Sequence, residues 1–240
     1  VPKNDEFFSE YSFPNRFKLI SNFSGSAGLA IVLKDKNLLF VDGRYTLQAN
    51  IESGKNTSLH CHPTKKTGLI LLDGKIEVDL GFYEKRILKA PDKVMIRPGL
   101  FHSTKAVASK ITMLEIETPI DKSDLVRFKD EYGRAEKPYE GSGYISELNK
   151  DAIIFNQPAE HKIKKYIFNR SIVTIERHLN TSMLINRSLD TIFTILNGGL
   201  ISKSKKIVLS PGDVVRTETI IKLAEVFNTA NFIDILTVSK

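Results

Sequence analysis

The stretch TSLHCHPTKKTGLILLDGKIEV, residues 57–78, joins two histidines to an apolar run that ends at an Asp-Gly turn. Residues two apart on a strand point to the same face about 7 Å apart, so His60 and His62 can converge on one ion. The apolar run, bounded by turn residues, is typical of a buried strand. The stretch therefore predicts β structure carrying either half of a metal site or two polar residues at a strand edge.

A third histidine could complete such a site. His102 lies in RPGLFHSTKA, where Pro98-Gly99 forms a turn that presents the imidazole. Imidazole is a good ligand for Zn, Fe, Mn and Ni. By composition alone, a histidine pair is more often a surface feature than a ligand pair, so both interpretations stay open.

The rest of the chain indicates a mainly β protein. Between residues 57 and 118, the runs GLILL, KIEVDL, KVMIR and KITMLEIET recur about every ten residues, which is typical of a sandwich or barrel. Residues 119–150 are polar and predict a partly helical connector. From 151 to 240 the β pattern returns in RSIVTIERHL, TIFTILNGGLI, KKIVLSPGDVV and NFIDILTV.

An internal repeat relates the two β regions. Residues 66–74 can be laid over residues 190–198, and residues 89–94 over residues 209–215 with one gap. Each half then contains a buried strand, a tight turn and a Pro-Asp or Pro-Gly-Asp turn. The positions that overlie His60, His62, Thr67 and His102 are Leu184, Asn186, Thr191 and Leu223. The second half therefore predicts no ligand set.

Two segments of the first half resemble the two cupin motifs, HCHPTKKTGLILLDG and PDKVMIRPGLFH. His60, His62 and Gly74 match the spacing of the first motif, and Pro98 and His102 match the second. The resemblance implies two cupin-type β-barrels, at 57–118 and, degenerate, at 151–240. It also implies a divalent metal (Zn, Fe, Mn or Ni) held by the three histidines.

The resemblance is incomplete at one ligand. The position of the motif's glutamate falls on Thr67, which is a poor direct ligand and is a candidate substrate contact instead. The segment EIETPIDKSDLVRFKDEYGR is similar to the tail of cupins of sugar-phosphate and sugar-nucleotide metabolism. The implied function is binding of a sugar-type or acidic metabolite, with isomerase or epimerase activity. The alternative is a non-enzymatic binding or assembly module with a vestigial metal site.

The first 56 residues have a different character. NFSGSAGLAIVLKDKNLLFVDGRYTLQAN, residues 22–50, predicts a hairpin of LAIVL and NLLFV and then a helix over residues 45–52. It resembles the N-terminal creatinase-like domain of Xaa-Pro aminopeptidases (aminopeptidase P). A truncated α/β segment is therefore expected at 1–56, joined to the cupin by a natural fusion or by an assembly of unrelated fragments.

The second resemblance does not imply peptidase activity. That family's dinuclear site, with two aspartates, a histidine and two glutamates, lies in a C-terminal domain that residues 57–240 do not resemble. A non-catalytic aminopeptidase fragment joined to a cupin is accordingly a further alternative.

Composition sets the remaining expectations. The 240 residues carry a net charge of +7, but no basic cluster is interleaved with aromatics, so nucleic-acid binding is not expected. No apolar run approaches the roughly 20 residues of a membrane span, and the polar start is unlike a signal peptide. The single cysteine, Cys61, fits a reducing cytoplasm. A homodimer is left open.

Overall fold

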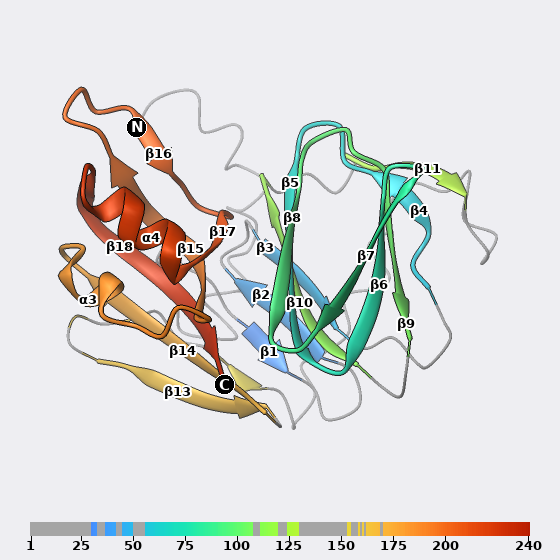
Figure 1. Ribbon diagram of the computed structural model, residues 1–240, viewed down its shortest axis with the longest axis horizontal. Helices are drawn as coiled ribbons and strands as arrows, with labels where there is room; N and C mark the ends of the chain where they lie inside the picture. The colour runs from blue at the N-terminus through green and yellow to red at the C-terminus, as the bar shows by residue number, and fades with distance from the viewer. Residues whose placement is uncertain are drawn as a thin grey trace, which may run out of the picture.

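The computed structural model describes a mainly β protein, as the sequence predicts (Figure 1). Within it, the described residues are 30–32, 37–41, 45–49, 56–107, 111–119, 124–129, 153–154, 158, 160, 162–168 and 170–240. The first 29 residues and most of the connector predicted at 119–150 lie outside this part of the chain, as do Asp42 and Arg44 of the aminopeptidase-like segment.

The first β unit consists of two antiparallel sheets. Its strands are β4 (Leu59–Cys61), β5 (Lys66–Asp73), β6 (Lys75–Leu80), β7 (Glu84–Lys89), β8 (Asp92–Ile96), β9 (His102–Ala106), β10 (Thr112–Thr118) and β11 (Val126–Lys129). One sheet has the order β10-β5-β8 and the other β11-β4-β9-β6-β7. Figure 1 shows them facing each other as one barrel-like body. Its core consists of Leu69, Leu71, Ile76, Val78, Leu80, Leu88, Val94, Ile96, Ala106, Ile111 and Met113.

The N-terminal segment adds a small sheet beside this unit. Its strands are β1 (Ala30–Val32), β2 (Asn37–Val41) and β3 (Tyr45–Ala49), with β12 (Ile153–Ile154) paired to β1. The predicted hairpin is confirmed, but the helix predicted over residues 45–52 is wrong, because β3 pairs with β2 along its whole length. This backbone pairing outweighs a weak helical preference. Because β3 lies beside β10, the N-terminal segment borders the first β unit.

The second β unit is one antiparallel sheet covered by helices. Its elements are β13 (Lys164–Phe168), β14 (Ser171–His178), α3 (Ser182–Ile185), β15 (Ile192–Ile201), β16 (Ile207–Leu209), β17 (Val214–Arg216), α4 (Thr217–Ala224) and β18 (Asn228–Ser239). The six strands form one sheet, and the two helices lie on one face of it. Over the described residues from 160 onward, this arrangement is a helix-covered sheet rather than a second closed barrel.

The internal repeat is visible in the strand register. Gly68 lies opposite Met95 in the β5–β8 pair, and Ile192 lies opposite Arg216 in the β15–β17 pair, the alignment that the sequence repeat requires. Helices α3 and α4 carry Leu184 and Leu223, the positions that overlie His60 and His102. The second unit therefore repeats the sheet but replaces the histidine-bearing strands by helices.

Strand β5 is buried on both faces, which explains its uninterrupted apolar run. Leu69 and Leu71 point into the first unit, whereas Ile70 and Leu72 pack against the sheet of the second. The shared core consists of Ile70, Leu72, Leu114, Ile116, Val173, Ile175, Ile192, Leu196, Val214, Leu236 and Val238. The fit is close, since a Cβ added to Gly68 would lie 2.4 Å from Cγ2 of Val214.

Candidate metal centre

The three predicted histidines converge inside the first β unit. His60 lies directly opposite His102 in the β4–β9 pair, and His62 follows on the same face of the chain. The ring centroids are 4.4 Å apart for His60 and His102, 5.1 Å for His60 and His62, and 5.7 Å for His62 and His102. The structure thus brings together three side chains that are up to 42 positions apart in sequence.

Each imidazole is oriented by a hydrogen bond from its Nδ1 atom to a backbone carbonyl. The acceptors are Ser58 O for His60 (2.8 Å), Asp124 O for His62 (2.6 Å) and Leu100 O for His102 (3.0 Å). A carbonyl only accepts, so the neutral ring carries its proton on Nδ1 and leaves the Nε2 lone pair available. This is how metal-binding histidines are commonly fixed.

Backbone contacts hold the segment around His62 in place. The Asp124 carboxylate accepts hydrogen bonds from the backbone N–H groups of Thr64 (3.0 Å) and Lys65 (2.9 Å). The N–H of Gly99 donates to the His62 carbonyl (2.7 Å), and Gly99 has a φ of 76°. The Pro-Gly turn predicted to present the third histidine therefore also fixes the second.

A glutamate that the sequence analysis missed completes the cluster. The ligand atoms of Glu115 and the three histidines all lie within 4.8 Å of one another. Glu115 is on β10, opposite Leu69, so the carboxylate comes from the other sheet instead of the motif position, Thr67. A signal was present in TMLEIET, where Met113, Glu115 and Glu117 alternate on the face that points into the barrel.

Glu117 forms a second carboxylate contact beside the cluster. Its oxygens lie 2.7 Å from His62 Nε2 and 3.0 Å from Lys65 Nζ, and Lys65 is buried. Burial alone would raise the Glu117 pKa, but His62 and Lys65 outweigh it and lower the pKa to about 2. Burial opposes protonation of His62, yet Glu117 outweighs burial and raises its pKa. A cation at this site would replace the His62 proton, because ligation requires neutral imidazole.

His60 and His102 are already neutral, which is the protonation state that metal binding requires. Burial is the main cause that lowers the pKa of His60 to about 4 and of His102 to about 3. Burial and the nearby Glu117 charge raise the Glu115 pKa to about 8. The buried Nε2 of His102 has no hydrogen-bond partner among the described residues. An unpaired imidazole nitrogen facing a carboxylate and two more imidazoles fits a divalent cation.

The geometry is compatible with a first-row transition metal. Metal–nitrogen bonds of about 2 Å place opposite ligands about 4 Å apart, so small side-chain movements would close the cluster around an ion. Three imidazoles and one carboxylate suit Zn, Fe, Mn or Ni. Thr67 is also buried in this unit, and its hydroxyl has no hydrogen-bond partner among the described residues. Its role as a substrate contact remains a prediction.

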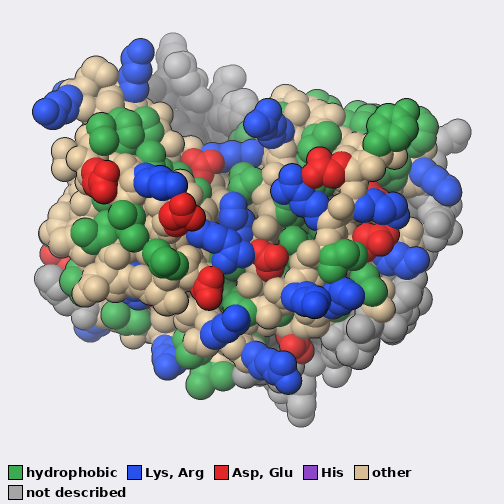
Figure 2. Space-filling model, viewed as in Figure 1, with side chains coloured by type: hydrophobic (Ala, Val, Ile, Leu, Met, Phe, Trp, Pro, Cys, Tyr) green, Lys and Arg blue, Asp and Glu red, His purple; other side chains and the backbone are tan. Residues whose placement is uncertain are grey.

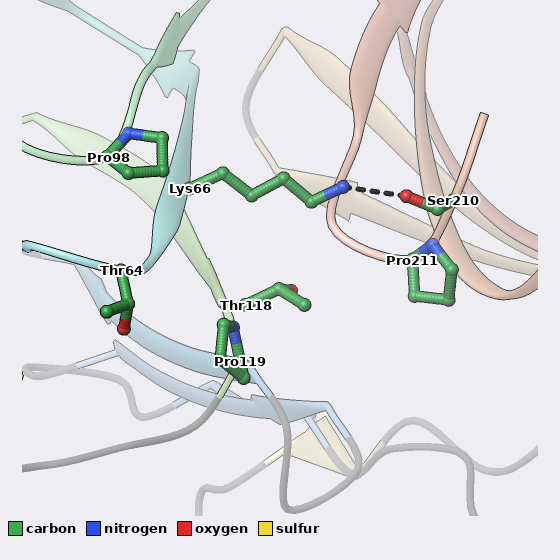
Figure 3. Close-up of a pocket in the computed structure, with 7 residues that line it drawn as sticks. All are labelled: Thr64, Lys66, Pro98, Thr118, Pro119, Ser210 and Pro211. Carbon is green, nitrogen blue, oxygen red and sulfur yellow. Dashed lines mark hydrogen bonds between the residues drawn. The ribbon is translucent and has the colours of Figure 1, made fainter. Parts of the chain in front are cut away.

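A separate pocket of about 460 Å³ lies where the two units meet (Figure 3). It is lined by Thr64, Lys66, Pro98, Thr118, Pro119, Ser210 and Pro211. The Lys66 amine donates to Ser210 Oγ (2.9 Å) and Asp213 Oδ1 (2.7 Å), so the protein itself neutralises its charge. None of the lining residues belongs to the histidine cluster, so this pocket and the cluster are separate features.

On one face of the molecule, acidic and basic side chains are mixed. On the face drawn in Figure 2, basic side chains lie among acidic ones and do not form one continuous basic surface. Within the described part of the chain, no helix has the length and apolar character needed to cross a membrane.

Comparison with curated proteins finds the aminopeptidase resemblance. Probable Xaa-Pro aminopeptidase P of Coprinopsis cinerea is 34% identical over 125 residues, covering 48% of this chain and 20% of the relative. Its Laccaria bicolor counterpart is 49% identical over 61 residues, covering 25% and 10%. Xaa-Pro aminopeptidase 1 of Dictyostelium discoideum is 28% identical over 207 residues, covering 82% and 30%, so this match extends beyond residue 56. In all three, the chain spans under a third of the relative's length.

Comparison with solved structures finds the cupin resemblance. A Klebsiella pneumoniae protein with a double-stranded β-helix domain has a TM-score of 0.36 at 15% identity, covering 40% of this chain and 79% of that one. A putative sugar phosphate isomerase from Acidithiobacillus ferrooxidans has a TM-score of 0.30 at 21% identity, covering 32% and 52%. A cupin 2 domain-containing protein from Halorhodospira halophila has 0.29 at 22%, covering 32% and 53%. No protein-family model matches the chain.

Proposed function

We propose that the first β unit is a metal-dependent site for a small sugar-type or acidic metabolite, acting as an isomerase or epimerase. The observation that carries the proposal is the cluster of His60, His62, His102 and Glu115, whose ligand atoms lie within 4.8 Å of one another.

Some residues of the site would bind the cation, and others would orient those ligands. The three histidines and Glu115 would hold the metal, and the carbonyls that accept from Nδ1 would keep the rings in position. When bound, a divalent ion supplies Lewis-acid polarisation of a carbonyl or hydroxyl oxygen. Glu117, fixed between His62 and Lys65, would orient these two side chains beside the metal.

A metabolite rich in oxygen suits such a centre. Carboxylate and hydroxyl oxygens complete the coordination of a transition metal that keeps open positions. Thr67, whose buried hydroxyl lies in the same unit, is the first candidate to contact this metabolite. The resemblance of residues 115–134 to sugar-metabolism cupins supports the same class of ligand.

A non-enzymatic binding module is the second candidate function. It is favoured by the second unit, which keeps the sheet register but carries helices at the ligand positions. A metabolite that raises the melting temperature without turnover would support this alternative. Peptidase activity is not part of the proposal. The proposed location is the cytoplasm, in keeping with a buried, unpaired Cys61.

Metal content of the purified full chain tests the proposal. We expect about one equivalent of transition metal per chain by plasma mass spectrometry, and loss of most of it in the His60→Gln and His102→Gln variants. His178→Gln is the matched control, because His178 is bonded to Glu176 in the second unit. Wild-type protein that takes up no metal after incubation with Zn, Fe, Mn and Ni would overturn the proposal.

A further inference from the structure

His62 is held in a different way from the other two histidines of the cluster. The Nδ1 atoms of His60 and His102 bond to backbone carbonyls only two residues away in their own segments. His62 lies one residue beyond the end of β4, and its Nδ1 donates to the carbonyl of Asp124, 62 positions further along the chain. The orientation of this imidazole therefore depends on a second segment of the protein.

The register of β11 explains why Asp124 reaches this point. Val126 lies opposite Cys61 in the β11–β4 pair. Because the two strands run in opposite directions, the position two residues before Val126 corresponds to the position two residues after Cys61. Asp124 consequently comes to lie beside Pro63, the residue that follows His62.

The Asp124 carboxylate fixes the turn that follows His62. Its oxygens accept hydrogen bonds from the backbone N–H groups of Thr64, at 3.0 Å, and Lys65, at 2.9 Å. A charged acceptor makes such bonds about twice as strong as neutral ones, and Asp124 is only 8% exposed. One residue thus holds the His62 ring through its carbonyl and the backbone after His62 through its carboxylate.

The contact with Asp124 leaves the metal-facing nitrogen of His62 available. The Nδ1 atom donates to Asp124 O at 2.6 Å, whereas the Nε2 atom lies on the side of Glu117 and the cluster. A cation bound at Nε2 leaves the Nδ1 bond intact. The hydrogen bond to Asp124 can therefore orient the ring both with and without the ion.

We propose that Asp124 is a positioning residue of the metal centre, which sets how tightly His62 binds the cation by holding both its ring and the backbone that follows it. Hydrogen-bond partners of ligating histidines commonly account for about 10–100-fold in metal affinity. This inference rests on the proposed function and identifies the segment that controls one of its ligands.

Cobalt binding by the full chain provides the test, because the affinity for Co²⁺ and its visible spectrum both respond to a misplaced ligand without requiring turnover. The variants are Asp124→Ala, which removes both carboxylate oxygens, and Asp124→Asn, which keeps one oxygen acceptor. Each is made in the wild type and in a His62→Gln background. Asp79→Asn is the matched control, since the Asp79 carboxylate accepts from Ser103 Oγ (2.7 Å) instead of holding the turn after a histidine.

Thermal melting is measured for every variant. If Asp124→Ala fails to fold, the milder Asp124→Asn variant carries the test. We expect Asp124→Ala to weaken cobalt binding about 10–100-fold and Asp124→Asn to weaken it less, with both spectra shifted toward that of His62→Gln. Asp79→Asn should match the wild type. In the His62→Gln background, the Asp124 substitutions should change the affinity by less than about twofold, because the ligand through which Asp124 acts is gone.

The failures of the two proposals are distinguishable. Wild-type protein that takes up no cobalt overturns the metal site and this inference together. If the wild type binds cobalt and the folded Asp124 variants have the same affinity and spectrum, this inference alone is overturned. It is also overturned if the Asp124 substitutions weaken cobalt binding equally with and without His62, since Asp124 would then act on the fold and not through this ligand.

Discussion

His60 and His102 face each other across neighbouring strands, with their ring centroids 4.4 Å apart. Two buried imidazoles at this distance cannot both be protonated without strong repulsion. Burial is the main cause that lowers their pKa values to about 4 and about 3, and the charge of His60 lowers the pKa of His102 further. The pair is therefore neutral at physiological pH and ready to bind a cation.

Glu115→Gln should reduce metal affinity by at least about tenfold, because an amide oxygen is a weaker ligand and carries no charge to offset that of the cation. Competition with a chromophoric chelator measures this loss. Glu77→Gln is the matched control, since Glu77 forms an ion pair with Lys85, which is 64% exposed. If Glu115→Gln and the wild type bind the metal with equal affinity, Glu115 is not a metal ligand.

Glu176 should make the protein sensitive to acid. It accepts hydrogen bonds from Thr174, His178 and Arg187; burial raises its pKa, but these partners outweigh burial and lower the pKa from 4.5 to about 2. The folded state therefore binds the proton more weakly than the unfolded chain. The resulting stabilisation, on the order of 3 kcal/mol, is present above about pH 5 and is lost as the pH falls toward 2.

Urea unfolding at several pH values checks this dependence. Glu176→Gln should lower the free energy of unfolding at pH 7, and its difference from the wild type should shrink as the pH falls to 3. Glu84→Gln, at a carboxylate that is 54% exposed, should leave the curve unchanged. If the difference in unfolding free energy between Glu176→Gln and the wild type stays constant from pH 7 to pH 3, the lowered pKa of Glu176 is contradicted.

Leu72→Ala should destabilise both units together. Leu72 is fully buried in the core that the two units share, so the cavity should cost about 2–5 kcal/mol. Calorimetry should show one transition at a lower temperature. Ile87→Ala, on a side chain that is 47% exposed, should change the free energy of unfolding by less than about 0.5 kcal/mol. Two separate transitions in the wild type would show that the units unfold independently.

Gly198 and Gly99 provide a matched pair of backbone variants. Both have positive φ, 67° and 76°, a region that costs an alanine about 1–2 kcal/mol. A Cβ at Gly198 would also lie 2.0 Å from the carbonyl oxygen of Phe232, whereas at Gly99 nothing lies within 4 Å. Gly198→Ala should therefore lower the melting temperature clearly more than Gly99→Ala. Similar decreases in melting temperature for the two variants would show that the backbone between β15 and β18 can move apart at little energetic cost.

The part of the site that follows local rules could be predicted from sequence. His60 and His62 share a face because strands alternate, and the turn before His102 presents it to the same cavity. Glu115 could not be predicted, because its approach depends on the register of β10 against β5, set over more than 40 positions. The alternation in TMLEIET indicates an inward-facing glutamate, but it does not indicate that this glutamate lies beside the histidines.

In the fold as well, some elements follow from local sequence patterns and others depend on neighbouring elements. The alternating and apolar runs predicted most of the strands correctly, whereas residues 45–49 form β3 because β2 lies beside them, which no short window reveals. Helix α4, Thr217–Ala224, lies in a region that the sequence indicates only as generally β. Its burial of Ile220 against the second sheet stabilises the helix through tertiary packing.

The two-sided burial of β5 makes the two halves of the molecule inseparable. Without residues 160–240, the first half would expose an apolar surface formed by Ile70, Leu72, Leu114 and Ile116 to water. Fragments with such a surface are expected to aggregate. The second half therefore keeps the outer face of β5 and β10 away from water, while the inner face of the same strands borders the histidine cluster.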